Sequence, residues 1–312
     1  MSDHSSIEWT DATWNPVRGC SRVSRGCGAA DGGGCYAERM AGRFCGPGMP
    51  YEGLVRIGKN GPRWTGKVRM ADNRILLAPL KWRTKRRVFV NSMSDLFHEK
   101  LRDEQIDRVF AVMLISALHE SRGGHTYQIL TKRPERQRDY LLAAPSRVDQ
   151  IATAAGRLMD DADGWHDSVH AHISKHGLVH PTIWLGTSVE DQATAEERLP
   201  ALEATPASIR FVSAEPLLGP LGIARHLMRG GERRIHWLIA GSESGPRSRP
   251  MDEAWVRSLR DQCTSADVAF FYKQKLIGRR KVGTPTLDGR KWVQFPRTAA
   301  LTATAPTAPT AR

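Results

Sequence analysis

The sequence predicts an α/β fold, a partial or complete (β/α) barrel of the TIM type. Six short runs rich in β-branched and aromatic residues are almost continuously hydrophobic, which is typical of parallel strands covered on both faces. Segments with the period of an amphipathic helix lie between several of these runs. Strand–helix alternation of this length is typical of (β/α) barrels. A doubly wound open sheet is the alternative, although no G-x-G-x-x-G or G-x-x-x-x-G-K-[ST] motif follows any of the runs.

The predicted strands begin near the N-terminus and continue almost to the end of the chain. A first strand or loop is expected in EWTDATWNPVRGC, ahead of the six hydrophobic runs. The six runs are RVFVNS (87–92), TYQILT (126–131), TIWLGTS (182–188), IRFVSAE (209–215), IHWLIAGSE (235–243) and VAFFYKQ (268–274).

Helices are expected between these strands. Asp103 is a good N-cap for a helix whose apolar residues, from Ile106 to Ala117, fall on one face. Asp191–Leu202 is a second candidate, and a third helix is expected to start near Asp252. A further helix, CYAERMAGRF, follows the second of the clustered cysteines.

Residues 1–297 are expected to form a single barrel-like domain with a helical insertion near 146–180. The insertion contains WHDSVHAHISKHGLVH, with five histidines, two pairs of which are four residues apart. Its regular apolar stripe and the lack of an H-E-x-x-H motif favour a polar surface helix over a metal site. The segment TAALTATAPTAPTAR (298–312) is of low complexity and is expected to be a disordered tail.

Composition restricts the class of protein. At 312 residues, with 40% hydrophobic and 25% charged residues, the chain has the composition of a globular protein. Its N-terminus lacks the basic start and apolar run of a secretory signal, and its longest apolar run, Val109 to Leu118, is about half as long as a membrane span. We therefore expect a cytoplasmic protein that does not interact with a membrane.

The formal net charge of +13 favours polyanionic partners, above all nucleic acid. Basic residues gather in KWRTKRR (81–87) and KQKLIGRRK (273–281), although either segment is equally compatible with an ordinary solvated surface. The first segment precedes a strand, whereas Arg279, Arg280 and Lys281 follow the last predicted strand. The second segment is therefore expected to lie nearer to a site at the C-terminal ends of the strands.

Each predicted strand is followed by polar or ionisable residues. In a barrel the C-terminal ends of the strands meet at one face, here called the mouth, where active sites form. Six of these residues are expected to face one shared cavity there: Asn91, Lys132, Ser188, Glu215, Glu243 and Lys273. Further strand-end residues are Ser92, Asp95, Arg133, Glu190, Ser213, Ser242, Arg249 and Gln274.

Four of the five cysteines lie between positions 20 and 45. In a reducing compartment such a cluster indicates metal ligands or catalytic groups more readily than disulfides. Thiolates suit zinc or iron–sulfur centres, but the gaps of six, seven and nine residues contain no C-x2-C pair of the kind common in structural zinc sites. The spacing leaves an iron–sulfur centre, a zinc site and unligated thiols open.

Six motifs resemble, in order, those of the three-Cys-motif phage proteins, a family of phages and bacteria that is described as a domain of unknown function. Together the motifs span roughly residues 6–275. They are IEWTDATWNPVRGCSRVSRGC with CYAERMA, VFVNSMSDLFHE, QILTKRPER, WLGTSVEDQ, RFVSAEPLLGPL and WLIAGSESGPRSRPMD.

The resemblance implies a radical S-adenosylmethionine-like enzyme with a partial barrel. Cys20, Cys27 and Cys35 would bind three irons of a [4Fe–4S] cluster, and S-adenosylmethionine would bind the fourth. Reductive cleavage of its sulfonium would give a 5′-deoxyadenosyl radical that abstracts hydrogen from the substrate. The resemblance also implies a methyltransferase-like partner protein encoded nearby. Together with the basic net charge, the resemblance predicts that the enzyme modifies or repairs nucleic acid or a nucleotide.

The sequence departs from the family pattern in two places. Seven residues separate Cys27 from Cys35, where the family usually has two. Because a Gly-rich insertion such as GAADGGG can loop out, the three sulfurs are still expected to converge, with Cys45 and Cys263 outside the set. Gly241-Ser242-Glu243 stands where the family usually has Gly-Gly-Glu, and it keeps the carboxylate.

The resemblance also suggests roles for the strand-end residues. The catalytic candidates are Glu215, Glu243 and Lys273, and the cofactor-binding candidates are Asn91, Ser188, Ser213 and Ser242. The candidates for binding substrate or phosphate are Lys132, Arg133, Arg249, Arg279, Arg280 and Lys281. Two other functions stay open: a zinc-stapled nucleic-acid-binding protein without catalysis, and an acid/base hydrolase that uses the Glu215 and Glu243 carboxylates.

Overall fold

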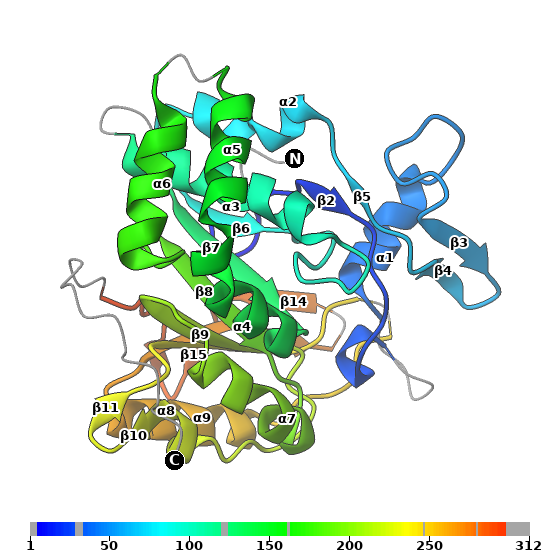
Figure 1. Ribbon diagram of the computed structural model, residues 1–312. Helices are drawn as coiled ribbons and strands as arrows, with labels where there is room; N and C mark the ends of the chain where they lie inside the picture. Colours follow the sequence, from blue (N-terminus) through cyan, green and yellow to red (C-terminus); the bar gives the residue numbers. More distant parts are fainter. Residues whose placement is uncertain are drawn as a thin grey trace.

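An eight-stranded sheet forms the centre of the molecule (Figure 1). The computed structural model describes residues 5–28, 34–119, 124–160, 163–245, 247–278 and 280–297. Neighbouring strands are parallel except at the last pair. In sheet order they are β1 (Ala12–Trp14), β6 (Arg87–Val90), β7 (Thr126–Thr131), β8 (Ile183–Ser188), β9 (Ile209–Ala214), β12 (Trp237–Gly241), β13 (Ala269–Ile277) and β14 (Arg280–Gly283).

The sheet curls into an open half-barrel whose two edges are β1 and β14. The six predicted strands are confirmed, in the predicted order, as is a first strand within EWTDATWNPVRGC. Arg280 and Lys281 follow the last predicted strand, as expected, but a further strand that was not predicted contains them. This strand, β14, pairs antiparallel with the end of β13 as a hairpin. The hairpin forms because β13 continues through Ile277, beyond the point where its parallel partner β12 ends.

The inner face of the half-barrel is a packed aromatic core. Trp9, Trp184, Phe211, Trp237 and Phe271 are all at most 4% exposed and belong to one hydrophobic cluster. The ring centroid of Trp237 lies between 5.2 and 6.1 Å from five other aromatic rings. Side chains therefore fill the interior, as they do in (β/α) barrels.

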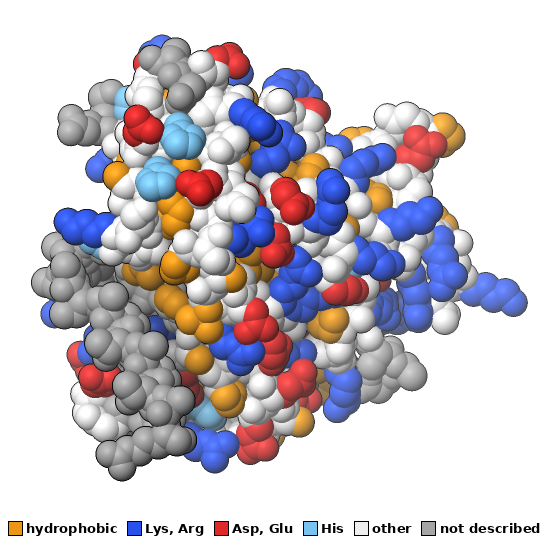
Figure 2. Space-filling view, viewed as in Figure 1, with side chains coloured by type: hydrophobic (Ala, Val, Ile, Leu, Met, Phe, Trp, Pro, Cys, Tyr) orange, Lys and Arg blue, Asp and Glu red, His pale blue; other side chains and the backbone are white. Residues whose placement is uncertain are grey.

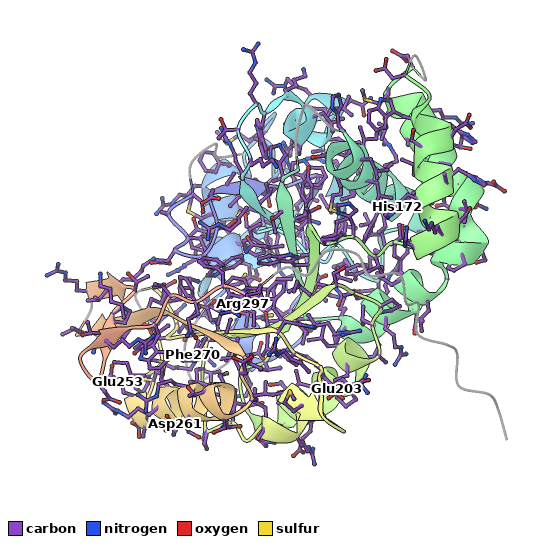
Figure 3. The ribbon with its side chains drawn as sticks, turned by 90° about the vertical axis from the view of Figure 1, so that its left-hand side faces the viewer. His172, Glu203, Glu253, Asp261, Phe270 and Arg297 are labelled. Atoms are coloured by element: carbon purple, nitrogen blue, oxygen red, sulfur yellow. The ribbon has the colours of Figure 1, made fainter. Side chains whose placement is uncertain are left out.

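Helices cover the outer face of the sheet in two groups. The first group packs over β6 to β8 and consists of α3 (Asp103–Leu118), α5 (Val148–Leu158) and α6 (Trp165–His176). The second packs over β9 to β13 and consists of α7 (Gln192–Glu203), α8 (Ala224–Leu227) and α9 (Glu253–Ser265). Figure 3 shows α6 with His172 and α9 with Glu253 and Asp261 at opposite ends of this outer layer.

The three predicted helix starts are close to those observed. Asp191 and Asp252 cap α7 and α9, accepting hydrogen bonds from the backbone N–H groups of Thr194 and Ala254. Asp103 is not an N-cap, because α3 begins at Asp103 itself after Arg102. The Gln105 side chain accepts a hydrogen bond from the Arg102 N–H, which fixes the start one residue earlier than predicted. In the first turn, Asp103 interacts favourably with the helix dipole.

A small lobe projects from the half-barrel beside the C-terminal ends of its strands, at the right of Figure 1. This α1 lobe (residues 34–64) consists of α1 (Tyr36–Ala41), a 3-10 turn (Gly42–Phe44) and the hairpin β3 (Val55–Gly58) to β4 (Gly61–Trp64). It has its own hydrophobic cluster, against which Cys20, Cys35 and Cys45 pack. Sequence analysis predicted its helix but not its hairpin.

The remaining elements are short connections. Three further two-stranded sheets are β2 (Val17–Arg18) with β5 (Arg69–Met70), β10 (Met228–Arg229) with β11 (Glu232–Arg233), and β15 (Thr286–Leu287) with β16 (Arg290–Lys291). The remaining helices are α2 (Asn73–Leu76), α4 (Pro134–Leu142) and the 3-10 turns Arg25–Cys27, Ala78–Lys81 and Ala144–Arg147.

Three predicted features fall wholly or mainly outside the described residues: the tail 298–312, Arg279 and the Gly-rich insertion between Cys27 and Cys35, of which residues 29–33 are not described. The predicted helical insertion at 146–180 contains α5 and α6. Along the part of the chain that the structure describes, no helix has both the length and the apolar character needed to cross a bilayer.

Candidate functional site

The cysteine segment (residues 20–28, 34 and 35) lies directly on the mouth. Ser24 Oγ donates a hydrogen bond of 3.0 Å to Glu190 Oε1, just beyond the end of β8. The backbone N–H of Gly34 donates one of 3.1 Å to Glu243 Oε1, just beyond the end of β12. Two carboxylates on different strands therefore hold the two described parts of this segment.

Glu190 is the centre of a buried ion cluster. Its carboxylate lies 3.1 Å from Lys132 Nζ and 3.1 Å from Arg198 Nη1. Glu190 is 0% exposed and Arg198 only 2%. Arg198 Nη1 also donates to the backbone carbonyl of Ser188, at 2.8 Å. One fully desolvated carboxylate thus balances two cations at the end of β8.

Glu243 and Arg249 form the second buried pair. Arg249 Nε and Nη2 each donate a hydrogen bond of 2.9 Å to the Glu243 carboxylate, one to each oxygen. Arg249 Nη2 also donates to the backbone carbonyl of Arg25, at 3.0 Å. The pair therefore fixes the position of the cysteine segment, and both oxygens of the predicted catalytic carboxylate are engaged.

Cys20 lies near Arg133, which forms ion pairs with Asp95 and Glu99. Burial and the charge of Asp95 raise the pKa of the Cys20 thiol, and the Arg133 guanidinium opposes them. Arg133 lies 3.1 Å from the Asp95 carboxylate and 2.8 Å from that of Glu99, and it donates to Ser21 Oγ at 2.7 Å. This predicted substrate-binding arginine therefore organises the start of the cysteine segment.

Cys27 and Cys35 have cationic neighbours as well. Burial disfavours the charged form of Lys132, but Glu190 and Cys27 together raise the pKa of its ammonium. The pKa of Arg22 is raised first by its hydrogen bond to Glu38 and also by Cys35 and Cys27. Each of these two thiols thus interacts electrostatically with a cation that already has a carboxylate partner.

The three thiols also affect one another. Besides burial, the charges of Cys35 and Cys27 raise the pKa of Cys20. Burial and then the charge of Cys27 raise the pKa of Cys35, whereas hydrogen bonds from the backbone N–H groups at the start of α1 lower it. A metal centre would supply the positive charge that such thiolates need, so the chemistry of this donor set fits one. Among the described residues, however, no three side chains are placed to hold a metal ion. The ligand set therefore stays a prediction.

Cys45 packs with Cys20 and Cys35 against the hydrophobic cluster of the α1 lobe, whereas Cys263 lies apart from them. Cys45 Sγ donates to the backbone carbonyl of Gly42 at 3.3 Å. Cys263 is 0% exposed in the core beneath α9, and burial raises its pKa to about 12. The surroundings of Cys263 are those of an ordinary core thiol.

Glu215 and Lys273 form a third, more accessible pair. Lys273 Nζ lies 2.9 Å from Glu215 Oε1, and their side chains are 18% and 11% exposed. Ser213 Oγ donates to Glu215 Oε2 at 3.2 Å. A Cβ at Gly241 would lie 2.7 Å from Glu215 Oε1, so this position accommodates the carboxylate only because it is glycine.

The other predicted site residues lie outside these three ion pairs. Asn91 Oδ1 accepts a hydrogen bond from the Val17 N–H at 3.3 Å, while Asn91 Nδ2 and Ser242 Oγ are buried without a hydrogen-bond partner in the described structure. Lys281 Nζ, on β14, lies 2.8 Å from Glu8 Oε1, and Arg280 is exposed. Ion pairs thus occupy the strand ends beneath the cysteine segment, where one shared cavity was expected.

Arg198, Arg22 and Glu38 were not identified from the sequence, and Glu190 was identified only as a strand-end residue. Glu38 is 2% exposed, accepts a 2.6 Å hydrogen bond from Arg22 Nη2 and accepts another from the Trp64 N–H. The one available signal was a carboxylate on the apolar side of a short helix, between Ala37 and Ala41. The partner Arg22 is distant in sequence and could not be identified from the pattern.

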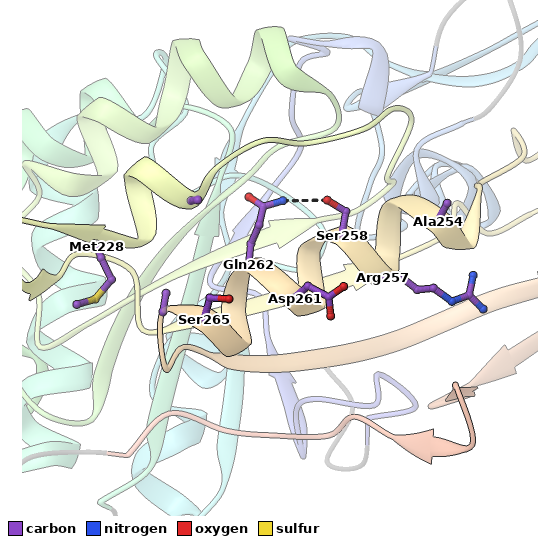
Figure 4. Close-up of a pocket in the computed structure, with 9 residues that line it drawn as sticks. Met228, Ala254, Arg257, Ser258, Asp261, Gln262 and Ser265 are labelled. Atoms are coloured by element: carbon purple, nitrogen blue, oxygen red, sulfur yellow. Dashed lines mark hydrogen bonds between the residues drawn. The ribbon is translucent and has the colours of Figure 1, made fainter.

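A hollow of about 790 Å³ lies away from the strand ends. It is an open groove on the outer helical layer between α8 and α9, where Gln262 Nε2 donates to Ser258 Oγ at 3.2 Å (Figure 4). Its other polar side chains include Arg257 and Asp261.

A family model described as "Protein of unknown function (DUF5131)" matches residues 4–296. The chain belongs to this family. The DUF5131 match covers the half-barrel, the cysteine segment and the α1 lobe together, so all three are parts of one family domain. Among curated proteins and among solved structures, no significant match to the chain was found.

Replacing Gly26 by alanine should displace the cysteine segment without unfolding the half-barrel. A Cβ at Gly26 would lie 2.2 Å from Glu190 Oε1, and that carboxylate cannot move because two cations hold it. We expect faster cleavage at the cysteine segment in limited proteolysis, with nearly unchanged far-ultraviolet circular dichroism. Gly34→Ala is the matched control, since a Cβ there meets no atom within 4 Å. Equal cleavage of the two variants would contradict the contact.

Proposed function

We propose that this protein is a radical S-adenosylmethionine-like iron–sulfur enzyme that modifies or repairs nucleic acid or a nucleotide. The observation that carries the proposal is that one segment at the mouth of a parallel half-barrel carries three free thiols, those of Cys20, Cys27 and Cys35. These thiols act electrostatically on one another, and each has a cationic neighbour. The C-terminal face of such a sheet is where (β/α) enzymes place their chemistry.

Cys20, Cys27 and Cys35 would hold a [4Fe–4S] cluster. When bound with S-adenosylmethionine, such a cluster supplies one-electron reduction of a sulfonium. The cations beside the thiols would stabilise the thiolates, as positive charge does at reactive cysteines. In this proposal the buried Glu190 and Glu243 carboxylates position the cysteine segment and do not react.

The accessible Glu215–Lys273 pair is suited to a zwitterionic ligand. A carboxylate and an ammonium 2.9 Å apart can each bind the opposite charge of an amino-acid group such as that of S-adenosylmethionine. Asn91 Nδ2 and Ser242 Oγ, both buried without a partner in the described structure, are donors for a bound ligand. A methyltransferase-like partner protein remains part of the proposal and rests on the family resemblance alone.

The test is iron and sulfide analysis of protein purified and reconstituted without oxygen. We expect roughly four irons and four sulfides per chain and a brown protein, as a cubane cluster requires. Replacing Cys20, Cys27 or Cys35 singly by alanine should remove most of the iron, because each thiolate holds one iron of the cluster. Cys45→Ala should retain it.

Three results would count against the proposal. A colourless protein after reconstitution would remove the cluster altogether. One zinc per chain without sulfide would favour the zinc-stapled nucleic-acid-binding alternative. Loss of iron in Cys45→Ala equal to that in Cys20→Ala would mean that the ligand set is misassigned. Circular dichroism of each variant separates loss of iron from loss of fold.

A further inference from the structure

The α1 lobe exposes an unusual combination of side chains. It carries five cations, Arg39, Arg43, Arg56, Lys59 and Arg63, but only two carboxylates. Of those carboxylates, Glu38 is buried against Arg22, and Glu52 accepts a hydrogen bond from the Gly48 N–H. Figure 2 shows Lys and Arg side chains gathered over this lobe, at the right of the view.

Two of these cations face each other across the hairpin. Arg56 on β3 is paired in register with Arg63 on β4, and both are exposed, as is Lys59 in the connecting turn. No ion pair in the described part of the chain joins any of the three to a carboxylate. Like charges directly opposite on a hairpin destabilise it. A bound anion between the two guanidinium groups would remove that cost.

The same lobe forms one wall of a pocket of about 480 Å³, here called the lobe pocket. This volume lies within the range of small-molecule sites. Its aromatic lining is Tyr36, Phe44 and Tyr51, of which Tyr36 is 53% and Phe44 47% exposed. Large rings left open to solvent next to a pocket are typical of a binding surface.

The lobe pocket also has polar groups at its edge. Thr13 and Asn15 line it from β1 and the residues just after it, and the Arg18 guanidinium lies 5.9 Å from the Tyr51 ring. Flat rings for stacking, together with a few polar groups and a cation, match the chemistry of a nucleobase and its phosphate.

The pocket and the hairpin are joined by one turn of chain. Phe44 lines the lobe pocket, and Gly42, two residues earlier, lies so close to the hairpin that a Cβ there would be 2.6 Å from Pro62. Arg43, between them, is exposed. The pocket also adjoins the thiols, since Tyr51 and Met93 belong to the cluster that Cys20 and Cys35 pack against.

We propose that the α1 lobe binds single-stranded nucleic acid, with phosphates at Arg56, Lys59 and Arg63 and a base stacked in the lobe pocket. This inference rests on the proposed function, because binding at the lobe would bring the substrate strand beside the cysteine segment. A single strand fits better than a duplex, because only unpaired bases present their faces to aromatic rings.

The experiment measures binding of a fluorescein-labelled 12-nucleotide single strand of mixed sequence by anisotropy at several salt concentrations. The triple variant R56Q/K59Q/R63Q should weaken binding and lower the slope of log affinity against log salt by about 2, since each lost phosphate contact on a single strand removes about 0.7. The matched control K81Q/R83Q/K85Q removes three exposed charges at the opposite, N-terminal ends of the strands. It should change the slope far less.

Base stacking in the lobe pocket is tested by removing its exposed aromatic rings. Y36A/F44A should weaken binding by about five- to a hundredfold, because a stacked base contributes about that much per ring contact. Tyr36→Phe keeps the ring and should bind like the unaltered protein. The same oligonucleotide as a blunt duplex should bind more weakly and be insensitive to Y36A/F44A.

Iron analysis of the same samples separates this inference from the proposed function. The lobe variants should keep their iron, and a C20A/C27A/C35A protein that has lost its iron should still bind the strand. No binding of the single strand, or equal losses in the lobe and control triple variants, would overturn the inference whatever the iron content. Duplex binding as tight as single-strand binding would overturn it as well.

Discussion

Glu190→Ala should lower the free energy of unfolding by about 3 to 5 kcal/mol, the cost of breaking a buried ion pair by removing one partner. The carboxylate is 0% exposed and neutralises both Lys132 and Arg198. Its removal leaves the buried Arg198 and the partly exposed Lys132 at the end of β8 with too few anionic partners. Urea denaturation followed by circular dichroism measures the change.

Glu196→Ala is the matched control for this prediction. Glu196 lies on α7, only six positions away, and its contact with Arg225 is long, at 3.9 Å, with both side chains more than half exposed. Such exposed pairs contribute about 1 kcal/mol or less. Similar losses in the two variants would show that Glu190 is solvated and that the cluster is not a buried one.

Trp237→Ala should lower the free energy of unfolding by about 3 to 5 kcal/mol, the usual cost of truncating a buried aromatic residue. Trp237 is 0% exposed, and it lies at the centre of the aromatic interior. Its Nε1–H also donates to the backbone carbonyl of Gln294 at 2.9 Å, which ties the C-terminal segment to the barrel. The variant thus loses ring contacts and a buried hydrogen bond together. Thermal and urea denaturation both measure it.

Trp237→Phe should cost less than half as much, because a smaller ring stays in contact with Trp9 and Phe211. An alanine variant no less stable than the phenylalanine variant would mean that the interior does not depend on ring packing. The interior would then have to be packed loosely enough to collapse around the cavity that the lost indole ring leaves.

Most of the half-barrel could be predicted from the sequence because its strands are covered on both faces. Strands β8 and β9 are buried at nearly every position, since alternate side chains enter the aromatic interior and the helical outer layer. Their sequences therefore place hydrophobic residues next to one another, as at Ile183, Trp184 and Leu185. The β3–β4 hairpin gave no such signal. VRIG and GPRW are short, basic and largely exposed, and only Val55 and Trp64 contribute to a core.

The candidate site was predictable in its residue types but not in its pairings. Strand-end positions such as Lys132, Glu215 and Lys273 follow from the chain pattern, because parallel strands end on one side. The partner of a charge does not follow from it. Arg198 reaches Glu190 from α7, and Arg249 reaches Glu243 from a connection, through contacts that only the folded backbone brings together.

The attachment of the cysteine segment has a consequence for how the thiols become accessible. None of residues 21–28 is buried, and the contacts that hold them at the mouth are hydrogen bonds: Ser24 to a carboxylate, Ser21 to a guanidinium group and an imidazole, and the Arg25 carbonyl to a guanidinium group. Segments with few apolar contacts open locally at a free energy below that of global unfolding, and their backbone amides exchange with solvent early. This segment can therefore detach while the aromatic interior remains protected. Such an opening would expose sulfur atoms to solvent without requiring the barrel to unfold, and under the proposed function iron and sulfide would enter by this route.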